Sequence, residues 1–302
     1  MSAVVVRTPA KVNLALMVGP LRPDGFHELA SVYQAVSLYD EVTAAPATAG
    51  EISVTVEGVE AAKVPANASN LAVRAAVLLA DRCQVGDGVR LHIRKGIPVA
   101  GGMAGGSSDA AAALVACDAL WGTKLDRTDL LAFAARLGSD VPFCLVGGTA
   151  MGSGHGEVVT PALVRGTFQW VFALDTDGLS TPAVYAEIDR MRGDLAVLPP
   201  RISGELMAAL RAGDAAGLGR ALANDLQPAT LRLRPRLRQL LEAGEDAGAL
   251  GAVVSGSGPT CAFLARSADH AWDLAARLSG SGVCSSVRTA SGPVPGARII
   301  EP

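Results

Sequence analysis

The chain has 302 residues, a formal net charge of −3 and a mean hydropathy of +0.33, and half of its residues are hydrophobic. This length is enough for two modest domains with a sizeable core, and the small charge without a basic run argues against a nucleic-acid partner. Alanine supplies much of the apolar content, and no stretch reaches the roughly 20 unbroken apolar residues of a membrane-spanning helix, so no membrane association is expected.

The N-terminal residues and the cysteines both favour a cytoplasmic protein. The apolar run Val4–Val6 is followed directly by Arg7, and it is too short for a secretory signal. Five cysteines are scattered along the chain without a CxxC pair. This pattern argues against a disulfide framework or a zinc site and favours a reducing compartment.

The first 60 residues are predicted to be rich in strands, because apolar residues cluster or alternate there. The predicted strands cover residues 4–6, 12–18, 31–38 and 51–57. A helix with a Ser69/Asn70 cap is expected to run to Cys83, and a strand over 89–93 then leads into Lys95. Two more helices are predicted at 108–121 and 126–137, the second ending at Gly138.

The second half begins with a hydrophobic strand over Phe168–Leu174, which follows a glycine-rich segment and Pro161. The later predictions are a helix at 181–191, two or three helices within 203–246, strands at 252–255 and 260–265, a helix at 268–279 and a strand at 283–289. Helices and strands mix without strict βαβ alternation, which favours two α+β domains over one doubly wound sheet. The domains are predicted at residues 1–165 and 166–302.

A glycine-rich stretch from Pro98 to Asp109 opens directly onto the apolar residues Ala110–Val115. Glycines allow close backbone approach and positive φ, so successive N–H groups can converge on phosphate oxygens, and a helix N-terminus favours an anion. The stretch lacks the Gly-Lys-Ser/Thr of a Walker A loop, the G-x-G-x-x-G of dinucleotide sites and the G-x-S-x-G of hydrolases. Phosphate binding is favoured over a flexible turn that caps a core helix.

Two charged residues interrupt apolar segments at distant points of the sequence. Lys11 lies in a predicted strand, where it could simply face solvent at a strand edge, and Asp140 follows a predicted helix end, where it could be a capping residue. Kinase chemistry would use the two together. An acceptor hydroxyl needs a carboxylate to take its proton, and an ammonium keeps that carboxylate ionised and counters the phosphoryl charge.

Phe26 and His27 stand together in a turn, an arrangement that can stack on a base and read its edge. Packing plus a surface imidazole is the more common explanation of such a pair. Ser255–Thr260 is predicted to be a hairpin turn, and Thr181 is predicted to start a helix that carries Tyr185 one turn later. The other histidines, His92, His155 and His270, are assigned no function.

Together these segments resemble the GHMP kinase superfamily, named for galactokinase and the homoserine, mevalonate and phosphomevalonate kinases. The resemblance covers nearly the whole chain and is carried by Pro9–Leu14, Arg22–Leu29, Pro98–Asp109, Leu137–Pro142, Asn224–Pro228 and Ser255–Thr260. Within the superfamily, Asp24–Leu29 together with Lys11 and Asn13 is similar to the branch that acts on diphosphocytidyl-methylerythritol. The Gly-Glu-His signature of galactokinase-like chains is absent.

The resemblance implies a fold of two α+β domains, the first like domain 2 of ribosomal protein S5 and the second ferredoxin-like, with a cleft between them. It implies ATP-dependent phosphorylation of the 2-hydroxyl of 4-diphosphocytidyl-2-C-methyl-D-erythritol, a step of non-mevalonate isoprenoid precursor biosynthesis. Mg²⁺ is expected as a cofactor together with ATP, because a kinase must neutralise phosphate charge. Its ligands are unknown, although Ser108 is one candidate. The enzyme is expected to be a monomer or a weak homodimer.

The resemblance also implies roles for individual residues. Asp140 would be the catalytic base and Lys11 its charge partner. The residues implied to contact ATP are Lys95, Pro98, Gly101, Gly102, Met103, Ala104, Gly105, Gly106, Ser107 and Ser108. The substrate would contact Asn13, Thr181 and Asp140, with its cytosine hydrogen-bonded by His27 and stacked between Phe26 and Tyr185. The family commonly has Tyr and Phe, respectively, at the two stacking positions, and both residues here remain aromatic.

Two alternatives share the same glycine-rich loop. A superfamily kinase that acts on homoserine or a mevalonate would have no need of the Phe26–His27 pair. A catalytically silent nucleotide-binding regulator would keep the loop but lose the acid or the lysine. Because Lys11 and Asp140 are both present, the sequence favours an active kinase.

Overall fold

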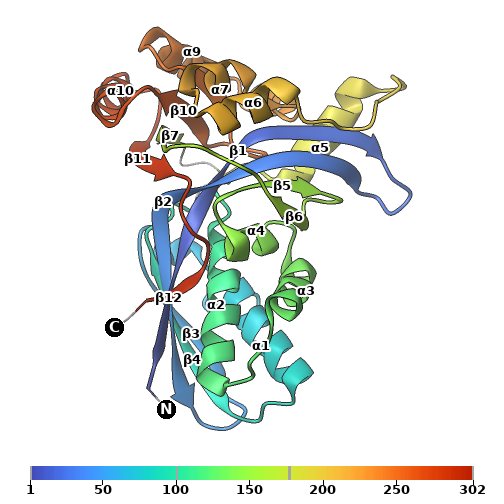
Figure 1. The fold of residues 1–302 in the computed structure, drawn as a ribbon, viewed down its shortest axis with the longest axis vertical. Coiled ribbons are helices and arrows are strands. Elements are labelled where there is room, and N and C mark those ends of the chain that lie inside the picture. The colour runs from blue at the N-terminus through green and yellow to red at the C-terminus, as the bar shows by residue number, and fades with distance from the viewer. Residues whose placement is uncertain (1, 100, 176–177, 301–302) are drawn as a thin grey trace.

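The structure, a computed structural model, describes residues 2–99, 101–175 and 178–300. Within these residues the first of two sheets has eight strands and a central path β12-β1-β2-β4-β3, with β5, β6 and β8 attached beside it. Its strands are β1 (Val4–Leu21), β2 (His27–Ala47), β3 (Ile52–Gly58), β4 (Gly88–Lys95), β5 (Thr149–Ser153), β6 (Val158–Pro161), β8 (Ala223–Asn224) and β12 (Arg298–Ile300). The long strands β1 and β2 reach from the N-terminal end of the molecule up to the second sheet (Figure 1).

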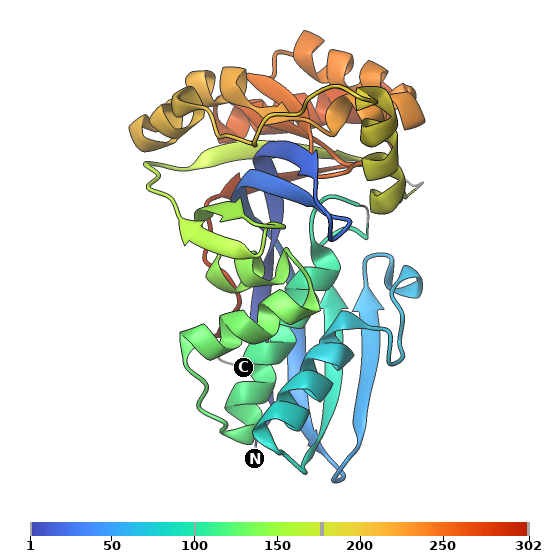
Figure 2. The ribbon, with the colours of Figure 1, turned by 90° about the vertical axis from the view of Figure 1, so that its right-hand side faces the viewer.

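Helices cover one face of this sheet, as the turned view shows (Figure 2). They are α1 (Leu71–Cys83), α2 (Gly105–Trp121), α3 (Arg127–Leu137) and α4 (Val141–Val146), preceded by the 3₁₀ helix η1 (Ala61–Lys63). The predicted Asn70 cap of α1 is confirmed, since its side chain accepts the amide of Ala72; Asp126, predicted to be the first residue of its helix, is instead the cap of α3 and accepts the amide of Asp129. The alanines of Ala110–Ala113 are completely buried, so α2 can pack closely on β1 and β2.

The second sheet has the order β11-β7-β10-β9. Its strands are β7 (Phe168–Leu174), β9 (Gly251–Val254), β10 (Cys261–Ala265) and β11 (Ser286–Gly292), and the helices of this half are α5 (Thr181–Arg192), α6 (Gly204–Ala212), α7 (Ala215–Ala221), α8 (Gln227–Leu233), α9 (Arg236–Asp246) and α10 (Ala268–Gly280). Alternate residues of β7 pack on opposite sides: Trp170 meets residues of β1 and α6, whereas Val171 meets residues of α9 and α10. Because both faces are covered, β7 is a nearly continuous apolar run.

The two-domain α+β architecture is confirmed, and several predicted elements have different bounds. The strands predicted at 4–6 and 12–18 are one continuous strand, because Lys11 and Asn13 are buried inside it rather than exposed at a break. The segment 203–246 holds four helices instead of two or three. The short elements η1, α4, β5, β6, β8 and β12 were not predicted, since none is long enough to show a clear periodic pattern.

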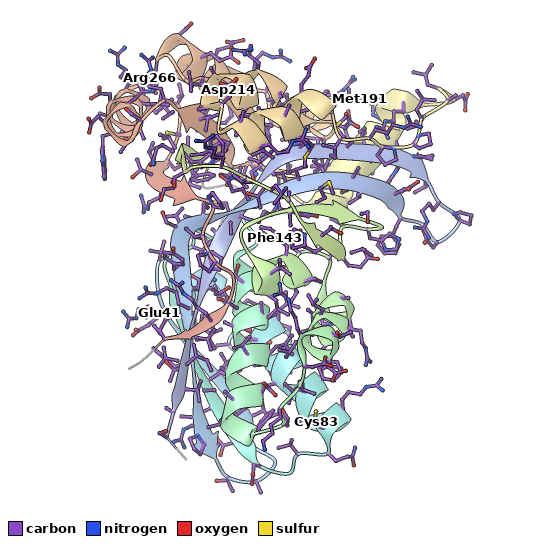
Figure 3. The ribbon with its side chains drawn as sticks, in the orientation of Figure 1. Glu41, Cys83, Phe143, Met191, Asp214 and Arg266 are labelled. Carbon is purple, nitrogen blue, oxygen red and sulfur yellow. The ribbon has the colours of Figure 1, made fainter. Side chains whose placement is uncertain are left out.

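The predicted division at residue 165 lies between β6, in the first sheet, and β7, in the second. The predicted second domain is nevertheless not confined to its own sheet. The C-terminal strand β12 returns to pair with β1, where Ile300 lies opposite Val5, and β8 pairs with β1 at Ala15. The side chain of Phe143 (Figure 3) packs with Tyr33 in a small cluster between α4 and β2. Shared strands thus fix the two halves to each other.

Candidate active site

Lys11 and Asp140 meet at the junction of the two halves. Lys11 lies in β1 and is only 3% exposed, and its Nζ donates to Oδ1 of Asn13 at 2.5 Å and lies 3.8 Å from Oδ2 of Asp140. The amide of Asn13 in turn donates to Ser31 Oγ at 2.9 Å, which holds the amide in place. Lys11 therefore does not face solvent at a strand edge but forms a buried, partnered cation.

Asp140 stands at the N-cap position of α4, but its side chain makes no capping hydrogen bond. The capping explanation for this residue is therefore wrong. Its side chain is 30% exposed, so one side of the carboxylate contacts Lys11 and the other remains open to an adjoining cavity. A partly open carboxylate beside a buried ammonium is the arrangement that a general base requires.

The glycine-rich loop is held against a second glycine turn. Ser255 donates its hydroxyl to the carbonyl of Gly102 at 2.7 Å, and a Cβ at Gly102 would lie 2.1 Å from the carbonyl oxygen of Ser255. Gly102 also has φ +99°, a conformation that side chains disfavour. The segment Ser255–Thr260, predicted as a simple hairpin turn, thus forms the support of the loop. Ala100 of the loop lies outside the described residues.

The helix α2 begins at Gly105, three residues earlier than predicted. The amide of Ser108 donates to the carbonyl of Ala104 at 2.8 Å, and the amides that precede it stand at the open start of the helix. Such amides, together with the helix dipole, suit a phosphate group. Gly105, Gly106 and Ser107 therefore supply this part of the loop with its anion-binding character.

Three of the residues predicted to contact ATP have buried side chains that are engaged inside the protein. Met103 is completely buried in the hydrophobic core beside Ile97. Ser108 is completely buried, and its hydroxyl donates to the carbonyl of Pro9 at 2.7 Å. Lys95 is 4% exposed and is held by two carboxyl groups.

These carboxyl groups belong to Asp40 of β2 and Asp109 of α2, whose Oδ2 atoms lie 2.5 and 2.7 Å from Nζ of Lys95. Asp40 also accepts from the amides of Gly96 and Ile97, where β4 passes into the glycine-rich loop. Burial raises the pKa of Asp109 to about 8, although Lys95 opposes that shift. The three side chains fix the base of the loop.

A cavity of about 960 Å³ adjoins the Lys11–Asp140 pair. Its lining includes the predicted substrate residues Phe26, His27, Thr181 and Tyr185. A smaller cavity of about 190 Å³ is lined by Lys11, Asn13 and Asp140. Five residues line both cavities: Leu29, Ser139, His155, Thr181 and Tyr185. The large cavity has the size typical of a small-molecule site, and it leads directly to the charged pair.

His27 is buried, with 6% of its surface exposed, and stacks on Tyr185 with ring centroids 5.4 Å apart. Its Nδ1 lies 3.0 Å from the carbonyl of Gly19 and its Nε2 lies 3.3 Å from Asp189. Both ring nitrogens therefore already face acceptors inside the protein. A hydrogen bond from the His27 ring to a base edge, as predicted, would have to replace Asp189.

Phe26 is the exposed aromatic of the cavity, with 59% of its surface accessible. It stacks on His155, with ring centroids 4.9 Å apart and an interplanar angle of 28°. No role was predicted for His155 from the sequence. The only local signal was its position in a glycine-rich turn, between Gly154 and Gly156, which both have positive φ.

Thr181 begins α5, as predicted, and shares a hydrogen bond of 2.8 Å with the hydroxyl of Ser257. This bond ties the helix that carries Tyr185 to the glycine turn that supports the phosphate loop.

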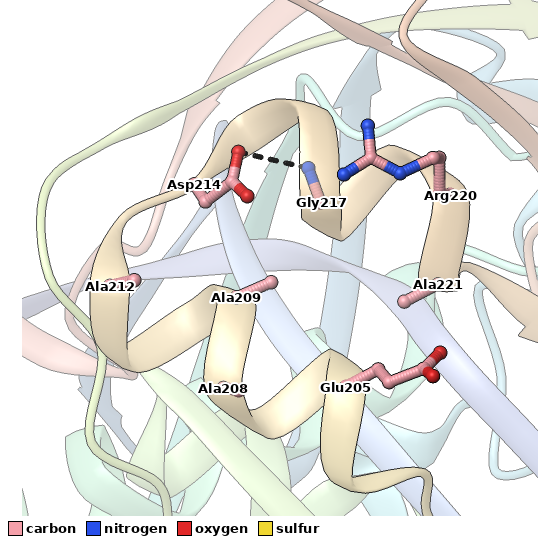
Figure 4. Close-up of a pocket in the computed structure, with 8 residues that line it drawn as sticks. All are labelled: Glu205, Ala208, Ala209, Ala212, Asp214, Gly217, Arg220 and Ala221. Carbon is pink, nitrogen blue, oxygen red and sulfur yellow. Dashed lines mark hydrogen bonds between the residues drawn. The ribbon is translucent and has the colours of Figure 1, made fainter.

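A separate cavity of about 470 Å³ lies on α6 and α7 and contains none of the predicted site residues (Figure 4). Alanine side chains form much of its wall, and Asp214 is engaged as the cap of α7 through the amide of Gly217. Among the described residues, no cluster of three or more His, Cys, Asp or Glu could hold a metal ion. No helix in the described part of the chain is long and apolar enough to cross a membrane.

Comparisons with known proteins place these features in context. Residues 70–148 match the family model for the GHMP kinases N terminal domain, and residues 206–284 match the model for the GHMP kinases C terminal domain. The chain is 59% identical to a 4-diphosphocytidyl-2-C-methyl-D-erythritol kinase of Thermobifida fusca, over 99% of each chain, and 57% identical to that of Streptomyces avermitilis, over 99% of this chain and 100% of the relative.

Solved structures give the same result for the fold. A crystal structure of 4-(cytidine 5'-diphospho)-2C-methyl-D-erythritol kinase superposes with a TM-score of 0.78 at 32% identity, covering 95% of this chain and 98% of the other. A homoserine kinase from Cytophaga hutchinsonii reaches a TM-score of 0.77 at 22% identity, covering 99% and 98%. The second likeness shows the shared fold alone.

Proposed function

This chain belongs to the GHMP kinases and, among them, to the 4-diphosphocytidyl-2-C-methyl-D-erythritol kinases, and we propose that it transfers the γ-phosphoryl group of ATP to the 2-hydroxyl of that compound. The reaction is a step of isoprenoid precursor biosynthesis by the non-mevalonate route. The site assignment rests on the contact between Nζ of Lys11 and Oδ2 of Asp140, which are 3.8 Å apart. Both residues lie between the glycine-rich loop and the large cavity.

In the proposed reaction, the acceptor 2-hydroxyl gives its proton to the open carboxylate oxygen of Asp140. The hydroxyl oxygen forms a bond to the γ-phosphorus while the bond from that phosphorus to the β,γ-bridging oxygen breaks, and ADP leaves with the electron pair. Lys11 lies beside the carboxylate of Asp140 and counters the charge on the transferring group. The amides at the start of α2 hold the phosphate oxygens, so catalysis is mainly positioning and electrostatics.

The proposal assigns Mg²⁺ to the nucleotide rather than to a preformed protein cage. Mg²⁺ usually keeps several waters and binds through substrate phosphates and one or two carboxylates. In the described part of the site, Asp140 is the carboxylate that faces the smaller cavity, whereas Asp40 and Asp109 are buried around Lys95. The residues therefore fit a metal that would bind together with ATP, with Asp140 available to hold it, and the metal would neutralise phosphate charge.

The acceptor is proposed to place its cytosine in the large cavity, between Phe26 and Tyr185. Both aromatic rings line that cavity, and Asn13 and Thr181 lie where the cavity approaches the charged pair. A base gains stacking energy from aromatic faces, and its size suits the space. We also propose a cytoplasmic enzyme that acts as a monomer or weak homodimer, in keeping with five free cysteines.

The experiment is a coupled assay of ADP release with three acceptors at the same ATP concentration: diphosphocytidyl-methylerythritol, homoserine and mevalonate. The proposal predicts release that depends on the first acceptor and is inhibited competitively by cytidine diphosphate. Release driven by homoserine or mevalonate would instead support another GHMP kinase activity. No acceptor-dependent release with any of the three would favour a silent nucleotide-binding protein.

A further inference from the structure

The aromatic ring of Phe26 has a partner that the family assignment does not explain. Phe26 lies in the short loop between β1 and β2, and more than half of its surface is exposed. An exposed ring on a loop loses side-chain entropy when it is fixed, so it needs a neighbour to hold one orientation. That neighbour is His155, whose imidazole stacks on the Phe26 ring with centroids 4.9 Å apart.

His155 is itself rigidly presented. It lies in the turn between β5 and β6, and its amide donates to Oε2 of Glu157 at 2.7 Å. The carbonyl of Gly154, one residue earlier, accepts the amide of Leu29 in β2 at 2.8 Å. The turn therefore cannot shift relative to β2 without breaking a backbone hydrogen bond. The imidazole projects from a fixed support rather than from a free loop.

Asp24 joins this support to the loop of Phe26. Its Oδ1 accepts the amide of Phe26 at 3.0 Å, and its Oδ2 lies 3.0 Å from Arg22 and 3.5 Å from Nε2 of His155. The hydrogen bond from the Phe26 amide lowers the pKa of Asp24, and the charges of Arg22 and His155 act in the same direction. One carboxylate thus holds the backbone that carries Phe26 and also lies near the ring that stacks on it.

His155 also has the position that a substrate-orienting residue requires. It lines both the large cavity, with Phe26 and Tyr185, and the small cavity, with Lys11 and Asp140. An aromatic ring has two faces, and His155 covers one face of Phe26. The other face remains for a base.

We propose that His155 is a positioning residue for the acceptor. By stacking on Phe26, His155 holds the phenyl ring in the one orientation that stacks on the nucleobase. The inference rests on the proposed function, because it deepens the account of the same acceptor site. His155 acts through Phe26 and has no part in the phosphoryl transfer. Its loss should therefore weaken acceptor binding while the chemical step and ATP binding stay as they are.

The test measures initial rates of ADP release for His155→Ala, His155→Phe, Phe26→Ala and the double variant. His155→Ala should raise KM for the acceptor roughly 2–10-fold, the value of one aromatic pair, with kcat and KM for ATP unchanged. His155→Phe, which keeps a ring against Phe26, should restore most of the loss. His92→Ala, a change in a partly exposed histidine of β4 outside both cavities, is the control and should leave all parameters unchanged.

The double variant decides between action through Phe26 and direct contact with substrate. If His155 acts through Phe26, His155→Ala has no further effect on acceptor KM in the Phe26→Ala background. Additive losses would overturn the proposal and indicate that His155 binds the substrate itself. An unchanged acceptor KM in His155→Ala would also overturn the proposal. A lowered acceptor KM would overturn it as well, because it would mean that His155 blocks the binding of the base.

Binding of cytidine diphosphate, measured by titration calorimetry without turnover, gives a second readout. The dissociation constant should rise by the same factor as acceptor KM in His155→Ala and recover in His155→Phe. An equal constant in wild type and His155→Ala would contradict the inference. A failure of the proposed function can be told apart from a failure of this inference. In the former case the wild-type enzyme would release no ADP with the diphosphocytidyl acceptor.

Discussion

Replacing Asp140 by Asn tests the proposed base with little change of shape. The carboxylate makes no capping hydrogen bond, and Lys11 keeps its hydrogen bond to Asn13 in the variant, so the protein should remain folded. The substitution removes an attraction across 3.8 Å that amounts to about 4 kcal/mol at an effective dielectric constant of about 20. It also removes the group that takes the acceptor proton.

Loss of a general base lowers the rate by about 10²–10⁴, which corresponds to about 3–5 kcal/mol in the activation barrier. We therefore expect kcat of Asp140→Asn to fall by at least two orders of magnitude. KM for ATP should change little, because the nucleotide is held chiefly by the glycine-rich loop. The assay is coupled ADP release at saturating ATP and acceptor, with circular dichroism to verify folding.

The matched control is Asp87→Asn, a change of the same kind in an exposed loop residue before β4. It should retain wild-type kcat. A kcat for Asp140→Asn within a factor of about ten of wild type would refute the reasoning, because it falls outside the range of general-base catalysis. The acceptor proton would then go elsewhere, and the Lys11–Asp140 pair would be structural.

Three other predictions concern the loop and its surroundings. Gly102→Ala should raise KM for ATP and lower the melting temperature, because the new Cβ would lie 2.1 Å from the carbonyl of Ser255; unchanged values in nucleotide titration and thermal melts would contradict this. The native state keeps the proton of Asp109, whose pKa is about 8, while the unfolded chain releases it near 3.8. The contribution of Asp109 to the free energy of unfolding is therefore full below pH 3.8 and is lost as the pH rises through about 8. Asp109→Asn should remove this pH dependence of the unfolding free energy, measured by denaturant titrations at several pH values. Phe26→Leu should raise acceptor KM more than ATP KM in steady-state assays, since an aliphatic side chain cannot stack on a base; an equal rise in both would indicate a folding defect.

Local signals predicted the elements with clear periodicity and caps. Asn70 and Asp126 cap their helices because a short polar side chain bonds amides two or three residues ahead, within one segment of sequence. The strand Phe168–Leu174 has the predicted bounds because both of its faces are buried. The return of β12 to β1 depends on contacts between the two ends of the chain, and no local pattern contains that information.

The site was predicted where residue types and family resemblance agreed, as for Lys11 and Asp140. Where a polar residue stands beside the loop, the sequence does not reveal whether its side chain faces a ligand or the interior. Lys95 and Ser108 both bond inward. His155 was missed because its contact with Phe26 arises only when the β5–β6 turn folds against the loop after β1.

The most direct test of the account is to locate the transferred phosphate. Wild-type enzyme is incubated with ATP and diphosphocytidyl-methylerythritol, and the product is analysed by phosphorus NMR and mass spectrometry. The expected product carries a new phosphomonoester on the oxygen of the tertiary 2-hydroxyl. The amount of this product equals the amount of ADP formed. A phosphate on another hydroxyl, or ADP formed with inorganic phosphate and unchanged acceptor, would contradict it.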